Sequence, residues 1–234
     1  MKKRTLALLM AVVMLFGVTV GGTIAWLTAE ATEVVNTFTV GDIKIKLVES
    51  EVDANGDKKS PVVEVQENSY KILPGSTYDK DPKVTVLAKS ENCYVYVKVT
   101  EINNDNDIIL WEINTSNWLA VDGADNVYVY SANGKSATIV NYSEQAQELP
   151  SIILYEEGST KHMDTIKIND TVTQAMVQAL DGIVNVEDYD SVDAANAAKN
   201  AEIAARPKLN FDAYAVQAAN MTDAVAAWNE TFGK

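Results

Sequence analysis

The sequence predicts an all-β protein built as a β-sandwich. About ten short stretches rich in valine, isoleucine and tyrosine recur along most of the chain, several with strict apolar/polar alternation. Glycine, asparagine, aspartate and proline separate these stretches at short intervals. No internal repeat or low-complexity linker divides the chain. We therefore expect one domain, over residues 41–234, in which two packed sheets bury a common core.

Residues 1–25 have the composition of a secretory signal peptide. They open with three basic residues, continue with an apolar run over residues 6–20 and close with small residues. The apolar run is shorter than the roughly 20 residues that a membrane-spanning helix needs. We expect a signal peptidase to recognise Thr23 and Ala25 and to release a mature chain that begins at Trp26.

The segment at residues 26–40 is long, mostly uncharged and partly β-branched. Only Glu30 and Glu33 carry charge within it. A segment of this kind suits a strand that adds to the open edge of another sheet through backbone hydrogen bonds. A disordered tail over residues 26–36 is the alternative that the composition leaves open.

The strands follow from alternation and from β-branched and aromatic content. We expect them at residues 43–47, 61–65, 84–87, 93–100, 108–111, 118–121, 127–130, 137–140, 152–155, 166–168 and 208–217. Asn133-Gly134 lies between two of these stretches and predicts a hairpin that joins 127–130 to 137–140.

Three stretches favour helix over strand. A short one covers residues 172–180, and residues 222–228 form a closing helical turn. An alanine-rich insertion near residues 188–206 has Asp190 or Ser191 as its N-cap. Its apolar face is shallow, so we expect a surface helix laid over the sandwich.

The charge of the chain excludes two classes of partner. The formal net charge is −14, and removal of the signal, with its three basic and no acidic residues, makes it about −17. A chain this acidic is repelled by nucleic-acid phosphates and by anionic lipid. We therefore expect no nucleic acid partner and, after cleavage, no membrane association.

The residues that carry most enzyme chemistry are scarce. His162 is the only histidine, and no His-Glu-x-x-His, Gly-x-Ser-x-Gly or glycine-rich phosphate loop occurs. Cys93 is the only cysteine, and its alternation with valines predicts a buried, unreactive thiol. Asp105 and Asp107 are the best candidate metal ligands, although a solvated loop is the favoured interpretation. We expect neither enzymatic activity nor a cofactor.

Three parts of the chain resemble the TasA/camelysin family of exported Gram-positive proteins. The N-terminal match is Gly-Gly-Thr-x-Ala, an aromatic residue and Phe-x-x-Gly, carried by Gly21, Gly22, Thr23, Ala25, Trp26, Phe38 and Gly41. The internal match is Pro-Gly, Lys-Asp-Pro-x-Val and a valine strand, carried by Pro74, Gly75, Lys80, Asp81, Pro82, Val84, Tyr94, Val95, Val97, Lys98 and Val99. The last match is the strand 213–217 followed by Ala227 and Trp228. Residues 101–206 match only loosely.

The resemblance implies a jelly-roll sandwich, export through a dedicated signal peptidase of the SipW type, and a place in the biofilm matrix or on the cell surface. TasA-like subunits donate their N-terminal strand to the next subunit, and such head-to-tail contacts build an open-ended fibre. By this analogy the residues of the homopolymer contact are Trp26, Leu27, Val34, Val35, Phe38 and Val40. A camelysin-like surface metalloprotease and a non-polymerising surface adhesin are the alternatives.

Overall fold

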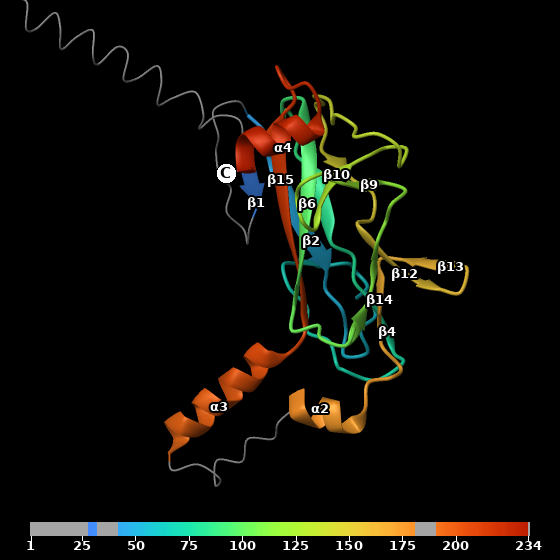
Figure 1. Cartoon of the computed structure of the whole chain (residues 1–234), viewed down its shortest axis with the longest axis vertical. Coiled ribbons are helices and arrows are strands. Elements are labelled where there is room, and N and C mark those ends of the chain that lie inside the picture. The colour runs from blue at the N-terminus through green and yellow to red at the C-terminus, as the bar shows by residue number, and fades with distance from the viewer. Residues whose placement is uncertain (1–27, 32–41, 181–190, 234) are drawn as a thin grey trace, which may run out of the picture.

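The computed structural model describes residues 28–31, 42–180 and 191–233. Strands dominate these residues, and the pairings between their strands are antiparallel, which confirms the prediction of an all-β fold. The largest sheet has the strand order β1-β15-β6-β10-β9 (Figure 1). Its strands are β1 (Thr28–Ala31), β15 (Lys208–Gln217), β6 (Cys93–Ile102), β10 (Val127–Tyr130) and β9 (Trp118–Ala120).

Three smaller sheets complete the described strands. The first has the order β11-β5-β2-β3, with β11 (Gln147–Glu148), β5 (Lys83–Val86), β2 (Ile45–Ser50) and β3 (Glu64–Val65). The second has the order β13-β12-β8, with β13 (Thr160–Met163), β12 (Ile153–Glu157) and β8 (Glu112–Ile113). The third has the order β4-β14-β7, with β4 (Thr77–Asp79), β14 (Thr165–Ile168) and β7 (Ile109–Leu110).

β6 and β15 are the longest strands in the described part of the chain. They pair over ten residues, from Lys208 opposite Ile102 to Gln217 opposite Cys93. The valines and tyrosines of β6 favour extended backbone. The observed bounds of β15 coincide with the predicted strand 208–217.

One hydrophobic core lies between β6 and β15 on one side and β2 and β5 on the other. Alternate residues of β6 face it, as the sequence predicted for Cys93 and its valine neighbours. Its buried members from these four strands are Cys93, Val95, Val97, Val99, Leu209, Ala213, Ala215, Ile45, Val84 and Val86. This shared core holds the two sheets against each other by burial of apolar surface.

Helix α4 (Ala224–Phe232) covers the opposite face of β6 and β15 (Figure 1). Tyr94 and Tyr96 on that face are buried, and the Tyr96 hydroxyl donates to the Ala224 carbonyl at 2.7 Å. The first half of β6 is therefore buried on both sides. Alternation with exposed residues begins only at Lys98, beyond the reach of the helix.

Two further helices precede β15. They are α2 (Gln174–Leu180) and α3 (Val192–Ala205), and the two contact each other. The Ser191 hydroxyl accepts a hydrogen bond from the Ala194 N–H at 3.1 Å, which makes Ser191 the cap of the two predicted candidates, Asp190 and Ser191. Figure 1 shows α3 running away from the ends of the strands, so the expectation that it lies over the sandwich is wrong. Only two residues separate α3 from β15, so the end of α3 lies close to the start of that strand.

The hairpin predicted around Asn133-Gly134 does not form. Residues 137–140 contribute one bridge, between Val140 and Cys93, and one backbone bond from Thr138 to Tyr130. The reason is that β10 already pairs with β6 on one side and β9 on the other. Only Tyr130, at the end of β10, accepts a backbone bond from this stretch, so residues 137–140 do not pair along β10.

Two other predicted strands are shortened or divided. Of residues 61–65 only β3 pairs, and Val62 is exposed. Residues 108–111 pass from β7, which pairs with β14, to β8, which pairs with β12. The chain changes sheets at Trp111, so one apolar run serves two sheets.

Gly56 is a position where the fold requires the absence of a side chain. Its φ is +86°, and a Cβ atom there would lie 2.1 Å from Cδ1 of Tyr78. Gly123 has a similar φ of +77°, and a Cβ atom added there would meet no atom within 4 Å. Gly123→Ala is therefore a control that measures the cost of placing alanine at a positive φ without a steric clash. We expect Gly56→Ala to lower the free energy of unfolding by about 2 kcal/mol more than Gly123→Ala, because only Gly56→Ala displaces the buried ring. Urea unfolding of both variants measures the difference, and equal losses would contradict the close contact.

Candidate functional site

The first candidate site is the side of β15 that faces β1, which we call the β15 edge. The four residues of β1 pair antiparallel with β15, from Thr28 opposite Val216 to Ala31 opposite Ala213. Among the described residues, positions 208–212 of β15 have no strand partner on this side. A strand edge of this kind presents backbone N–H and C=O groups to any extended chain that reaches it.

The predicted polymerisation segment is represented in the structure by β1, at residues 28–31 within 26–40. The predicted cleavage and polymerisation residues lie outside the described residues: Thr23, Ala25, Trp26, Leu27, Val34, Val35, Phe38 and Val40. The structure therefore places a strand from this segment on the β15 edge of its own chain.

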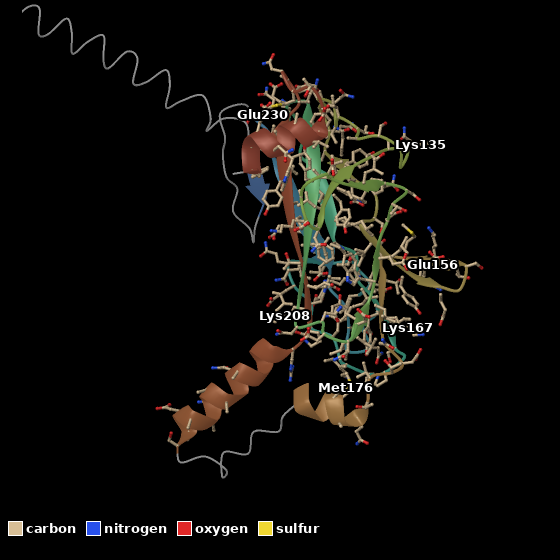
Figure 2. The ribbon with its side chains drawn as sticks, viewed as in Figure 1. Lys135, Glu156, Lys167, Met176, Lys208 and Glu230 are labelled. Atoms are coloured by element: carbon tan, nitrogen blue, oxygen red, sulfur yellow. The ribbon has the colours of Figure 1, made fainter. Side chains whose placement is uncertain are left out.

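Aromatic residues brace the part of β15 that pairs with β1. Tyr214 lies edge-on to Trp228 of α4, with ring centroids 5.4 Å apart, and Trp228 lies 4.5 Å from Phe232. Tyr96 of β6 packs on Trp228 at 5.1 Å. Figure 2 labels Glu230 on α4 at one end of the sheet and Lys208 at the other. These contacts hold the part of β15 that pairs with β1 in a fixed position.

The second candidate site is a group of buried charges beneath β15. The Lys80 Nζ lies 2.8 Å from Oε2 of Glu49, and both side chains are nearly buried. The same ammonium lies over the rings of Tyr70 and Phe211, 5.6 and 5.4 Å from their centroids. Because Phe211 belongs to β15 and Glu49 to β2, this pair joins the two sheets by a charged contact.

Asp81 is the most buried charge of this group, with 1% of its surface exposed. Its two carboxylate oxygens accept hydrogen bonds from the Ser50 N–H and hydroxyl, both at 2.7 Å. The ammonium groups of Lys58 and Lys83 lie 3.2 and 3.6 Å from Oδ2. Burial alone would raise the pKa of Asp81, but the hydrogen bonds from Ser50 and the charge of Lys58 outweigh burial and hold the pKa below its ordinary value.

Lys80 and Asp81 belong to a motif that is visible in the sequence, but the sequence pattern did not predict their partners. One signal could have identified Glu49, which continues the alternation of Ile43, Ile45 and Leu47 at a position where an apolar residue is expected. A carboxylate on the buried face of a strand needs a compensating cation. Lys80 is that cation, 31 positions along the chain.

The weak metal candidates lie in a turn between β6 and β7. Asp107 donates its backbone N–H to the Asn104 carbonyl, and its own carbonyl accepts from the Asn169 side chain. The described residues contain no group of three or more histidine, cysteine, aspartate or glutamate side chains able to hold a metal ion. His162 lies in β13 and stacks on Tyr155, and burial raises the pKa of Cys93 to about 12.

No family model, curated protein or solved structure matches this chain. In the ranges that the structure describes, no helix combines the length and the apolar composition that crossing a membrane requires.

Asp81→Asn tests the buried charges through the pH dependence of stability. Because the folded-state pKa of Asp81 is depressed, its stabilising effect is complete above the ordinary aspartate pKa of about 3.9 and is lost as the pH falls below it. We expect Asp81→Asn to cost about 2–4 kcal/mol at neutral pH and to flatten the loss of stability below about pH 4. Urea unfolding across this pH range is the measurement. Asp105→Asn, in the exposed turn, is the control, and an equal loss in both variants would contradict the assignment.

A double-mutant cycle tests the Lys80–Glu49 pair. We expect Lys80→Met alone to cost about 3–5 kcal/mol, because Glu49 is left charged and buried without a partner. The double variant Lys80→Met, Glu49→Leu should cost less than the sum of the two single variants. Denaturant unfolding of all four proteins gives the coupling. Additive losses would show that the two side chains do not compensate each other.

Proposed function

We propose that this chain is a secreted structural protein of the extracellular matrix or cell surface that assembles into fibres by exchange of its N-terminal strand. The observation that carries the proposal is the pairing of β1 with the β15 edge. In the monomer this pairing is made within one chain, and in the fibre the same register is made with the next copy. A contact between two different surfaces of identical subunits repeats without closing.

The energetics of β1 favour exchange over permanent closure. Its sequence Thr-Ala-Glu-Ala contains no large apolar residue, so backbone hydrogen bonds supply most of its attachment. Each such bond contributes about 1 kcal/mol net, and four paired residues therefore hold the strand only weakly. A longer donated segment that also pairs along positions 208–212 of β15 would bind more strongly.

The remaining elements of the proposal follow from the sequence. Residues 1–25 act as a signal cleaved by a dedicated peptidase, and the cut frees residues 26–40 for donation. The two sheets with their common core are the body of a jelly-roll-like β-sandwich. The resemblance to the TasA/camelysin family supports both points. The acidic surface opposes self-association, so salt should promote assembly by screening it.

A disulfide lock tests the proposed exchange. Ala29 lies directly opposite Ala215, so a cysteine at each position can bridge β1 to β15 within one chain. In a Cys93→Ala background, the protein beginning at Trp26 with Ala29→Cys and Ala215→Cys should form no filaments when oxidised. Filaments should appear after reduction. Negative-stain electron microscopy gives the readout, and non-reducing electrophoresis separates bridges within a chain from bridges between chains.

The controls separate this proposal from its alternatives. Each single cysteine variant should assemble in both redox states, and deletion of residues 26–36 should leave a folded protein without filaments. Filaments from the fully locked or the truncated protein would show that another surface drives assembly. Monomers from every form, across salt and pH, would favour a surface adhesin. Stoichiometric bound metal with proteolytic activity would favour the camelysin-like alternative.

A further inference from the structure

Residues 131–138 form a loop instead of the hairpin that Asn133-Gly134 predicted. In this loop the side chain of Asn133 is held by hydrogen bonds from the residues that follow it. The side-chain carbonyl oxygen of Asn133 accepts hydrogen bonds from the backbone N–H groups of Lys135 at 2.9 Å and Ser136 at 3.2 Å. The hydroxyl of Ser131 lies 3.2 Å from the same oxygen, but its shorter hydrogen bond, at 2.6 Å, is donated to the Ser136 carbonyl. Asn133 itself is exposed, and Figure 2 shows Lys135, two positions later, on the outside of the molecule.

The two backbone N–H groups point at an oxygen that would gain negative charge if the neighbouring backbone nitrogen attacked Asn133. Nitrogen attack on Cγ converts the side-chain carbonyl into an oxyanion, and N–H groups aimed at that oxygen stabilise it. The attacking nitrogen belongs to Gly134, which has no side chain to hinder its approach. Among the described residues, the Gly134 N–H makes no hydrogen bond that would hold it away.

We propose that Asn133 is a site of spontaneous deamidation in the folded protein. The Gly134 nitrogen forms a bond to Asn133 Cγ, and the bond from Cγ to Nδ2 breaks. The Gly134 proton passes through solvent to the departing nitrogen, which leaves as ammonia. Water then opens the five-membered imide at either carbonyl, which produces aspartate or isoaspartate at position 133. No oxidant, cofactor or second protein takes part.

The second Asn-Gly pair of the chain, Asn55-Gly56, is protected by its structure. The Gly56 N–H donates to the Asp53 carbonyl at 3.0 Å, and Gly56 is buried against Tyr78. Attack by this nitrogen requires that hydrogen bond to break first. The packed ring opposes the backbone movement that would follow. The two pairs share the tripeptide Ala-Asn-Gly and differ in their flanking residues and in their surroundings in the fold.

The two products at position 133 have different consequences for the loop. Aspartate keeps the acceptor for Lys135 and Ser136 and adds one negative charge to the surface. Isoaspartate lengthens the backbone by one methylene beside Gly134, whose missing Cβ would lie 2.8 Å from the Thr115 carbonyl oxygen. Because this contact leaves no room, isoaspartate should detach the loop from the turn at residues 114–117.

The test compares both asparagines in one sample. The mature protein is incubated in warm, mildly alkaline buffer, folded and in parallel in concentrated urea, then digested with trypsin. Fragment mass spectrometry quantifies aspartate and isoaspartate at positions 133 and 55. In the folded protein we expect Asn133 to convert at least about tenfold faster than Asn55, because conversion at Asn55 must first break a hydrogen bond and move a packed ring. In urea the two rates should converge.

Each alternative result would overturn the proposal. Equal rates in the folded protein would show that the loop does not promote attack by Gly134. A preference for Asn133 that persists unchanged in urea would place its origin in the flanking sequence instead of the fold. Asn133→Gln serves as the control variant, because it should abolish the product at this position while Asn55 keeps its rate.

Discussion

The antiparallel ladder between β6 and β15 is the interaction on which the rest of the structure depends. It joins two ten-residue strands that are more than a hundred positions apart in the sequence. One face of the ladder forms the core with β2 and β5, and the other face carries α4. Its two edges pair with β10 and β1. A shift of one residue would exchange the two faces, so burial on both sides fixes the register.

Buried charge adds a second constraint to this hydrophobic framework. Lys80 and Asp81 follow directly after β4 and reach Glu49 and Ser50, the last two residues of β2. A buried ion pair adds little net stability over an apolar replacement, but loss of one partner is costly. Such pairs therefore favour one arrangement of strands over others. This gives the Lys-Asp-Pro motif a physical role beyond the turn that the sequence suggests.

The proposed strand exchange depends on a weakly attached segment, whereas the proposed deamidation depends on an ordered loop. The β15 edge is braced by Tyr214, Trp228 and Phe232 from one side, whereas β1 pairs with it along only four residues. A rigid acceptor and a weakly held donor are what strand exchange needs. The loop at Asn133, in contrast, is ordered by its own hydrogen bonds, and two of them fall on the oxygen where the proposed attack would develop negative charge.

The sequence by itself determined the elements whose signal is local and strong. The pattern of β6, the bounds of β15 and the buried face of Cys93 could all be predicted, because propensity and alternation act within a few residues. The cap of α3 could be narrowed to Asp190 or Ser191. Only the tertiary structure decided where strands stop and which charges meet. Asn133-Gly134 has strong hairpin chemistry, yet β10 pairs with β6 and β9, two strands that precede it in the chain. Glu49 finds Lys80 through folding of the chain, and no local pattern specifies a partner 31 residues away.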